Sequence, residues 1–392
     1  MKILQVSTAF KPSWETGGTT RITYELSKGL INRNHEVTVY TTDRGQKRVN
    51  TLKNQPINVD GVIVYYFTNI SNYLAMHMNI VTPYYLPFIA RKKIKEYDLI
   101  HIHEHRTFLA VIVQYFAKKY NIPYVVQAHG SVRPFFQKET IKNIYDFLFG
   151  NNILKNASKV IAVSDNEVEE YKSMGVEKNK IEIVPNGINL SEFKNLPNKG
   201  EFRKNYTSLK NSEKVILYLG RIHKIKNIDL IIMAFADLLK ELGKIKLVII
   251  GPDAGNLLNL KRLIKDLNIN DEVLFTGPVY ERDKLEAYVD SDVFVSMCND
   301  EIFGITFLEA LASGTPIICS KEGGIADYIN EIAGFSIDYD KKILKNKLIE
   351  ILTNEELKIR FGNNGKLLVN ELFNLDKIVN KFERIYVGLT KT

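Results

Sequence analysis

The feature that most limits what this chain can fold into is a repeated alternation between short apolar runs and segments with helical periodicity. Helical spacing is clear in Thr19–Ile31, where Ile22, Leu26 and Leu30 recur on one face. Continuous runs rich in Val and Ile, separated by helices, are typical of a parallel sheet that is covered on both faces. The runs of the first half are Lys2–Val6, His35–Thr41, Leu99–His103, Tyr124–Ala128, Val160–Val163 and Ile181–Val184.

The alternation stops near residue 190 and resumes near residue 215. Residues 191–213 lack periodicity, and Pro197–Gly200 is typical of a linker. At 392 residues the chain is too long for one ordinary core. We therefore predict two doubly wound α/β domains that leave a cleft between them, the first over residues 1–190. The runs of the second domain are Val215–Leu219, Lys246–Ile250, Val273–Thr276, Val293–Ser296 and Pro316–Cys319.

Cysteine content and hydropathy exclude several classes of protein. Two cysteines, Cys298 and Cys319, form no disulfide framework, and no Cys and His cluster has zinc spacing. No apolar run approaches the roughly 18 residues that a membrane span needs. The chain turns polar too soon after its first strand to fit a signal peptide. A reduced, cytoplasmic protein is therefore expected.

The net charge of +8 lies entirely in the first half of the chain. Residues 1–190 hold 24 Lys and Arg against 16 Asp and Glu, whereas residues 191–392 hold 29 of each. No motif of a nucleic-acid-binding module accompanies this excess, so we expect no nucleic-acid partner. An anionic membrane surface or a phosphorylated acceptor fits the charge better.

The densest basic run is Arg91–Lys95, directly after the apolar and aromatic stretch Tyr84–Ile89. Together they could form an interfacial helix that is apolar on one face and basic on the other. The alternative is an ordinary amphipathic core helix with a solvated basic end. A membrane role would fit a lipid-linked acceptor and a peripheral position at the inner face of the membrane.

Ligands of doubly wound sheets bind beyond the carboxyl ends of the strands, so motifs that follow strands carry the most weight. Gly17 and Gly18 follow the first strand but lack the G-x-G-x-x-G fingerprint, so a nicotinamide cofactor is not indicated. The two glycines either form a turn or let backbone N–H groups at a helix start approach an anion.

A second loop, residues 220–227, follows the run Val215–Leu219 and opens a helix. Arg221 offers a fork of hydrogen-bond donors that suits phosphate oxygens, and Lys226 adds a point charge near the helix start. Asn227 is placed to cap that helix. The alternative is a solvated basic loop, but two cations after a strand favour an anion site.

The stretch N-D-E-I-F-G-I-T-F-L-E-A-L-A-S-G-T-P, residues 299–316, carries two carboxylates eight residues apart, Glu301 and Glu309. A helix should start near Gly304 and end at the Ser313–Pro316 stop, so its N-terminus would favour a diphosphate. Each carboxylate can accept two hydrogen bonds from a vicinal diol. The set suits a ligand with hydroxyls at both ends and phosphates between. The alternative is a surface charge and a helix-packing residue.

Several other polar residues are weaker candidates. His129 follows the run Tyr124–Ala128, a position that favours function over the usual structural role of a lone histidine. The three histidines at 101, 103 and 105 resemble a metal tract, but the run is too short to predict a metal site. The triplets Asp290–Asp292 and Asp338–Asp340 have a metal-chelating pattern but sit in no glycine-rich loop after a strand, so we interpret them as incidental.

Taken in order, these motifs resemble the family-4 retaining glycosyltransferases of the GT-B fold, and the resemblance covers nearly the whole chain. Its most specific part is the block Glu301-Ile-Phe-Gly through Glu309-Ala to Gly314-Thr-Pro. The other matching motifs are Gly17-Gly18, His129-Gly130, Pro185-Asn-Gly-Ile188, Gly220-Arg221, Lys226-Asn227 and Phe275-Thr-Gly277.

The resemblance implies two Rossmann-like domains facing a central cleft. The first, residues 1–190, would bind the acceptor, and the second, residues 191–374, the nucleotide sugar. Residues 375–392 would form a final helix that crosses back to the first domain. No cofactor is implied, and no metal is required if Arg221, Lys226 and the helix start offset the charge of the leaving diphosphate. The partners would be a nucleotide sugar and a glycan or polyprenyl-linked acceptor.

The resemblance also assigns roles to residues. Arg221 and Lys226 would bind the diphosphate, Glu309 the ribose diol, and His129 the sugar near its 6-position. The remaining positions would hold the sugar (Glu301 with the backbone of Phe303, Gly304 and Ile305), frame the base (Thr276, Gly277, Pro278) and line the phosphates (Gly17, Gly18). Departures from the family pattern at Ile302, Thr306 and Gly130 loosen the assignment at the acceptor side more than at the sugar-donor side.

The expected activity is transfer of a hexose, with retention of anomeric configuration, to a hydroxyl during synthesis of cell-surface polysaccharide or glycoconjugate. One alternative is a nucleotide-sugar epimerase of the same fold, which would need acid–base carboxylates that we cannot place. Another is a non-catalytic partner subunit, which should have lost some of Arg221, Lys226 and Glu301, yet all three are present.

Overall fold

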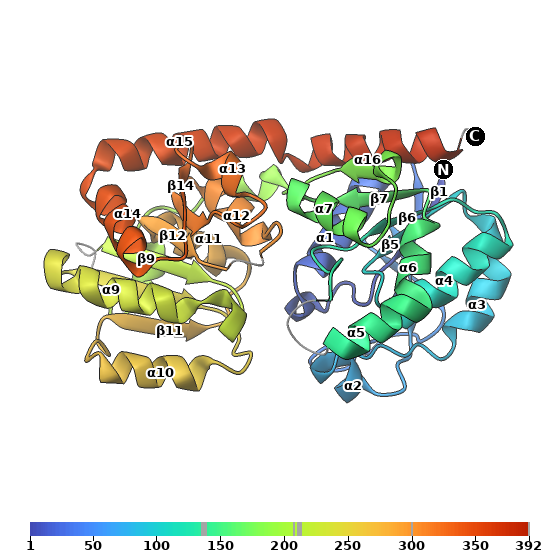
Figure 1. Ribbon diagram of the computed structural model, residues 1–392, viewed down its shortest axis with the longest axis horizontal. Coiled ribbons are helices and arrows are strands. Elements are labelled where there is room, and N and C mark those ends of the chain that lie inside the picture. The colour runs from blue at the N-terminus through green and yellow to red at the C-terminus, as the bar shows by residue number, and fades with distance from the viewer. Residues whose placement is uncertain (135–138, 207, 210–213, 299–300, 391–392) are drawn as a thin grey trace. The chain divides into compact units, whose positions relative to one another are not determined.

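The computed structural model describes residues 1–134, 139–206, 208–209, 214–298 and 301–390 (Figure 1). Asn299 and Asp300 of the carboxylate-bearing stretch lie outside the described residues, as do the last two residues of the predicted final helix. The chain forms two compact units. Unit 1 comprises Met1–Gly187 and Leu375–Thr392, and unit 2 comprises Ile188–Asn374.

Unit 1 is built on an eight-stranded sheet with the strand order β3-β4-β2-β1-β5-β6-β7-β8. Neighbouring strands are parallel except for β3 and β4, which form an antiparallel hairpin. All six predicted runs of the first half are strands, and the hairpin is additional. The strands are β1 Lys2–Val6, β2 Glu36–Thr42, β3 Pro56–Val59, β4 Val62–Phe67, β5 Leu99–His103, β6 Tyr124–Gln127, β7 Lys159–Ala162 and β8 Ile181–Ile183.

The helices of unit 1 connect these strands, as the alternating pattern predicts, except for the last one, which comes at the end of the chain. They are α1 Gly18–Ile31, α2 Asn72–His77, α3 Leu86–Lys93, α4 Phe108–Lys119, α5 Glu139–Tyr145 with the π-helical turn Asp146–Gly150, α6 Asn151–Lys155, α7 Asp165–Ser173 and α16 Leu375–Thr390.

The last helix, α16, packs on α1 within unit 1, so the end of the chain (red in Figure 1) joins the unit that holds its beginning (blue). Gly29 allows the close approach, because a Cβ atom there would lie 3.3 Å or less from both methyl groups of Val379. Glu383 of α16 contacts the Arg33 guanidinium at 2.9 Å and the His35 imidazole at 2.8 Å.

Unit 2 has a six-stranded sheet, entirely parallel, with the order β11-β10-β9-β12-β13-β14. All five predicted strands of the second half are confirmed, and β14 is additional. The strands are β9 Lys214–Leu219, β10 Ile245–Ile250, β11 Val273–Gly277, β12 Val293–Ser296, β13 Ile317–Ser320 and β14 Gly334–Ile337. The helices are α8 Glu201–Asn205, α9 Ile228–Leu242, α10 Leu257–Asp266, α11 Glu281–Asp290, α12 Ile305–Ser313, α13 Ala326–Ile329, α14 Lys341–Thr353 and α15 Glu355–Leu372.

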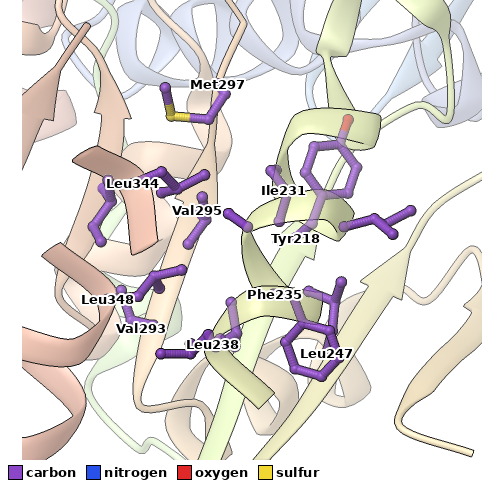
Figure 2. Packing of buried hydrophobic residues seen from close by; sticks show 14 of the residues in the cluster. Tyr218, Ile231, Phe235, Leu238, Leu247, Val293, Val295, Met297, Leu344 and Leu348 are labelled. Carbon is purple, nitrogen blue, oxygen red and sulfur yellow. The ribbon is translucent and has the colours of Figure 1, made fainter. Parts of the chain in front are cut away.

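The core of unit 2 shows why its strands must be continuously apolar. Alternate side chains of a strand point to opposite faces, so Val293 and Val295 face one covering layer while Phe294 faces the other. Figure 2 shows the first of these layers, where β9, β10 and β12 pack against α9 and α14. The helical side chains are Ile231, Phe235, Leu238, Leu344 and Leu348.

Helix α3 contains the basic run that suggested an interfacial helix, but its apolar face is used inside unit 1. Leu86, Ala90 and Ile94, at successive positions i, i+4 and i+8, are fully buried in the core. The basic end Arg91–Lys95 follows this buried face, whereas Tyr84, Tyr85 and Phe88 of the same stretch are exposed, so its interfacial role stays a prediction. None of the helices in the described part of the chain combines the length and apolar composition needed to cross a bilayer.

Candidate functional site

The predicted site residues fall into two groups, one in each unit. Gly17, Gly18 and His129 belong to unit 1, and all the others belong to unit 2. In unit 2, β9 lies between β10 and β12 although it precedes both, so the connections leave it in opposite directions. This is a topological switch point, where the loops beyond the strands diverge and leave room for a ligand.

The loops that follow β9 and β12 are in direct contact at this switch point. Lys226 donates a hydrogen bond to the Glu301 carboxylate, and both side chains are largely shielded from solvent. Burial opposes the charge on Lys226, but the Glu301 carboxylate and Cys298 together favour it, and the lysine pKa is raised. Arg221 is exposed in the same loop, close enough to affect the Lys226 pKa. The structure thus brings together both predicted cations and one of the carboxylates.

Asn227 does not cap α9 as predicted. Its backbone is left-handed, with φ of 51°, and no side-chain oxygen accepts a hydrogen bond from the helix. The amide instead donates to the Met297 carbonyl at 2.9 Å, which ties the β9 loop to the β12 loop. The short 3₁₀ turn Lys224–Lys226 precedes α9, and His223 caps this turn, because its Nδ1 accepts from the Ile225 N–H.

Helix α12 begins at Ile305, as its sequence predicts, and ends at Gly314 in the left-handed region with φ of 81°. Gly304 is its N-cap residue, and no side chain among the described residues is found to cap the first turn. The first N–H groups of a helix attract anions when no side chain satisfies them. A Cβ at Gly304 would lie 3.0 Å from the Glu301 carboxyl carbon, so this glycine leaves room for Glu301 itself.

Glu309 lies in the second turn of α12, almost fully buried, with partners that sequence reasoning missed. One carboxylate oxygen is paired with the Lys284 ammonium, and the other accepts from the Tyr288 hydroxyl at 3.1 Å. Both partners come from α11. Each oxygen retains a lone pair, so the group can still accept a hydroxyl hydrogen. The one sequence signal for Lys284 and Tyr288 was their spacing, because residues four apart in a helical segment lie on the same face of the helix.

The remaining predicted residues of unit 2 lie on two other segments. Thr276 and Gly277 end β11, and Pro278 follows in the exposed loop. The Gly277 carbonyl accepts from the Thr276 hydroxyl at 2.8 Å and from the Gly251 N–H at 3.0 Å. Phe303 is buried against the rings of two other aromatic residues, so only its backbone is suited to ligand contact.

In unit 1 the switch point lies at β1, which pairs with β2 on one side and β5 on the other. Gly17 is the N-cap residue of α1, with φ of 118°, and no atom of the described residues lies within 4 Å of where its Cβ would be. Gly18 is the first residue of the helix, and both are exposed. Glu104, which follows β5, accepts a hydrogen bond from the Thr8 hydroxyl at 2.9 Å and was not predicted. Burial raises its pKa, opposed by Arg44 and two threonine hydroxyls.

His129 follows β6 with a left-handed backbone, φ of 53°, and its ring is engaged inside unit 1. Its Nε2 lies 2.8 Å from His103 Nδ1, and His103 Nε2 lies 2.7 Å from the side-chain Oε1 of Gln5. Burial lowers the pKa of His129 to about 3, so its imidazole is neutral. Its Nδ1 is buried with no partner among the described residues.

A buried carboxylate braces the turn that carries His129. Glu167 of α7 accepts from the Gly130 N–H at 2.7 Å and from the Val163 N–H at 2.8 Å. Burial raises its pKa to about 7, although both N–H groups favour the charged form. No spacing in the sequence links Glu167 to Gly130, because the contact is made only when α7 packs behind the sheet.

The other candidates have structural roles. His101 Nδ1 contacts the Tyr386 hydroxyl of α16 at 2.7 Å. Asp290 accepts from the Arg203 N–H at 3.0 Å, and Asp292 pairs with Lys358 at 2.7 Å. The second triplet is similar: Asp338 pairs with Lys321 and Asp340 caps α14. Within the described ranges, no three His, Cys, Asp or Glu side chains cluster as metal ligands would.

Comparison with known proteins places the chain in a family. Residues 200–368 match the family described as "Glycosyl transferases group 1", and residues 16–192 match "Glycosyltransferase Family 4". The chain therefore belongs to the family-4, group 1 glycosyltransferases. The predicted GT-B fold is confirmed as well, because the structural neighbours are GT-B glycosyltransferases.

Three similar proteins illustrate the family. N-acetyl-alpha-D-glucosaminyl L-malate synthase of Bacillus anthracis is 26% identical over 96% of this chain and 95% of its own length. Alpha-monoglucosyldiacylglycerol synthase of Streptococcus pneumoniae is 31% identical over 66% of this chain, and the match spans 60% of that enzyme. Anabaena HepE, solved in complex with UDP and glucose, superposes with a TM-score of 0.78 at 20% identity, covering 99% of this chain and 100% of HepE.

The buried carboxyl group of Glu167 predicts a pH dependence of stability. Its folded pKa of about 7 exceeds the ordinary value of 4.5, so the folded state binds the proton more tightly than the unfolded state. The stabilisation that protonated Glu167 gives to the folded state is therefore present below about pH 4.5 and is lost as pH rises to about 7. Relative to Glu167→Gln, the free energy of unfolding of the wild type should fall by roughly 1–3 kcal/mol across this window. Urea denaturation of both proteins at several pH values measures the difference, and a constant difference would contradict the assignment.

Proposed function

We propose that this glycosyltransferase moves a hexose from a nucleoside-diphosphate sugar to a hydroxyl of a glycan or lipid-linked acceptor, with retention of configuration and without a metal. The single observation that carries the proposal is the contact between the Lys226 loop and the Glu301 loop beside the open N-terminus of α12. Cations and a helix N-terminus there suit a diphosphate, and carboxylates on either side suit hydroxyls.

The assignment of residues within this site is part of the proposal. Arg221, Lys226 and the first turn of α12 bind the diphosphate and offset the charge that develops on it as it leaves. Glu301 binds sugar hydroxyls, and Glu309 binds the ribose diol through its remaining lone pairs. The base lies along Thr276, Gly277 and Pro278. Unit 1 binds the acceptor, and its Gly17, Gly18 and His129 keep the roles that the resemblance implies, the two glycines at the phosphates and His129 at the sugar near its 6-position.

The proposed reaction is an attack on the same face from which the phosphate departs. The bond between C1 of the sugar and the phosphate oxygen breaks, and a bond between C1 and the acceptor oxygen forms. The acceptor proton passes to the departing phosphate oxygen, so the products are a glycoside and a nucleoside diphosphate. Fixed cations supply the stabilisation of charge that a metal supplies in other transferases.

Two features of the relatives support the choice of substrates. The names of the Bacillus and Streptococcus enzymes specify a glucosaminyl and a glucosyl product, both built from hexose units. The name of the Streptococcus enzyme also specifies a diacylglycerol, and HepE was solved with UDP. A UDP-linked hexose and a lipid-linked acceptor are therefore the first substrates to test.

Product stereochemistry tests the proposal as a whole. We expect UDP, among UDP, GDP and ADP, to raise the melting temperature most, because a ligand that binds the folded state stabilises it. With the sugar donor so identified, the anomeric configuration of the product, read by proton NMR, should match that of the donor. EDTA should leave the rate unchanged. An inverted product would exclude same-face attack, and loss of activity that Mg²⁺ or Mn²⁺ restores would exclude metal independence.

The cationic loop predicts a large effect on turnover. Arg221→Ala or Lys226→Ala should lower kcat by about 10²–10³-fold, because removing one group that stabilises transition-state charge costs roughly 2.7–4 kcal/mol. Lys224→Ala is the matched control. Lys224 is an exposed lysine of the same turn, and among the described residues it forms no ion pair with Glu301 or Glu309. Its kcat should stay near the wild-type value. Wild-type turnover by either test variant would remove the cationic loop from the mechanism.

The two carboxylates should separate in binding measurements. Glu309→Ala should weaken binding of the nucleoside diphosphate by removing the ribose contact, whereas Glu301→Ala should spare it and impair only turnover that depends on the sugar. Glu281→Ala, an exposed carboxylate on α11, serves as the control. Calorimetry with the diphosphate alone decides the point. Equal affinity for the diphosphate in the Glu309→Ala and wild-type proteins would refute the ribose role.

A further inference from the structure

The buried histidines of β5 and a glutamine of β1 form a polar row on one face of the sheet of unit 1. Gln5 pairs in register with His101, and side chains two apart on a strand share a face, so His103 lies on the same face. His129, just beyond β6, extends the row from His103, and the Tyr386 hydroxyl of α16 contacts His101. Gln5, His101 and His103 have almost no exposed surface. Buried polar groups are costly unless they bond to one another, so the directions of these hydrogen bonds are constrained.

The two histidine rings at the end of the row, His103 and His129, are neutral. Burial lowers the pKa of His103 well below its ordinary value, with further contributions from His101 and His129, and burial lowers the pKa of His129 to about 3. A neutral imidazole carries a single N–H, so one ring nitrogen donates a hydrogen bond and the other accepts one. The partner of one nitrogen therefore determines what the other nitrogen can bind.

The amide of Gln5 sets the direction of the hydrogen bonds that lead to His129. Its Oε1 lies 2.7 Å from His103 Nε2, and an amide oxygen only accepts, so Nε2 carries the proton of His103 and Nδ1 accepts. That Nδ1 lies 2.8 Å from His129 Nε2, and the two ring planes are 13° apart, so the N–H of His129 lies close to the plane of the accepting ring. His129 Nδ1 is consequently left without a proton.

A second neighbour agrees with this orientation of the Gln5 amide. Burial raises the pKa of the Tyr386 hydroxyl, and Gln5 opposes the rise, as an amide N–H₂ group beside a phenol oxygen does. The oxygen end of the amide is therefore the end that faces His103. With the reverse orientation, the protons of both rings would move to the other nitrogen, and His129 Nδ1 would donate.

We propose that Gln5 and His103 are positioning residues that hold His129 in the tautomer with Nδ1 as a hydrogen-bond acceptor, so that the ligand group it binds is a hydroxyl. Nδ1 is buried and has no partner among the residues that the structure describes. A buried acceptor without a donor is destabilising, and a ligand that brings the hydrogen removes this cost. A hydroxyl can donate that hydrogen, whereas a carboxylate offers only further acceptors.

This inference deepens the proposed function and rests on it, because the proposed function places His129 at the sugar near its 6-position. A hexose with a 6-hydroxyl then satisfies Nδ1, a 6-deoxyhexose leaves it unpaired, and a hexuronate sets a carboxylate against it. His103, part of the run that resembles a metal tract in the sequence, thereby gains a role in selecting the sugar. The tautomer exists without a substrate, so it can be measured even if the proposed reaction is wrong.

Long-range ¹H–¹⁵N NMR of histidine-labelled protein tests the tautomer directly, because protonated and unprotonated ring nitrogens resonate in different ranges. Wild-type His103 and His129, assigned as the signals lost in His103→Ala and His129→Ala, should both carry the proton on Nε2. Gln5→Met keeps the side-chain size but removes the acceptor, so it should shift both rings toward the Nδ1–H form. Gln114→Met is the control, because Gln114 is a buried glutamine of α4. A proton on Nδ1 of wild-type His129 would overturn the proposal, whether or not Gln5→Met folds.

Selectivity between sugar donors tests the ligand, with UDP release in the absence of an acceptor as the measurement. Wild-type kcat/KM should be about 10–100-fold higher with UDP-glucose than with UDP-6-deoxyglucose, because the missing hydroxyl leaves a buried acceptor unpaired. Gln5→Met should reduce this ratio to a few fold, mainly through slower use of UDP-glucose, and Gln114→Met should keep it. A wild-type ratio near one would overturn the hydroxyl assignment. Failure to use either sugar would contradict the proposed function instead, and the NMR result would still decide the tautomer.

Discussion

The parallel pairing of β9 with β12 is the constraint on which the candidate site of unit 2 depends. Because Ile216 and Leu217 pair in register with Val293 and Phe294, both strands end at the same edge of the sheet. The loops beyond them then meet, and the Asn227–Met297 bond holds them together. Both loops are built from residues that no local pattern connects, yet the order of the strands makes Lys226 and Glu301 neighbours. The position of the site is therefore determined by the sheet topology, and the side chains of the two loops then determine its chemistry.

The strands were predictable because a parallel sheet that is covered on both faces demands continuous apolar runs. The β3–β4 hairpin was missed because it interrupts the alternation of strands and helices, although Asp60–Gly61 at its turn is a recognisable hairpin signal. Side-chain partners were less accessible. Lys284 and Glu167 reach their partners only after α11 and α7 have packed, and Asn227 fails as a cap because its amide is used across loops.

Helices α3 and α5 show why periodicity alone does not identify a surface. Leu86, Ala90 and Ile94 repeat at helical spacing and are buried, as an amphipathic pattern predicts. Ile141, Ile144 and Leu148 repeat at helical spacing as well, yet they are exposed. For the α5 segment, the Arg106–Asp146 pair fixes which side faces inward. A sequence shows that a helix has an apolar face, but tertiary contacts decide whether the core uses it.

The two ion pairs of unit 2 give the proposed site a further property. Lys226 is paired with Glu301 and Glu309 with Lys284, so each of these partly buried charges is compensated by its partner. Unpaired charges there would cost several kcal/mol of desolvation. A diphosphate that attracts Lys226 would release Glu301 to accept hydrogen bonds from sugar hydroxyls, and the sugar in turn would free Lys226 for the phosphates. Under the proposed function, the diphosphate and the sugar therefore each promote the binding of the other. A ligand that lacks either part leaves one partner of the Lys226–Glu301 pair without a replacement contact.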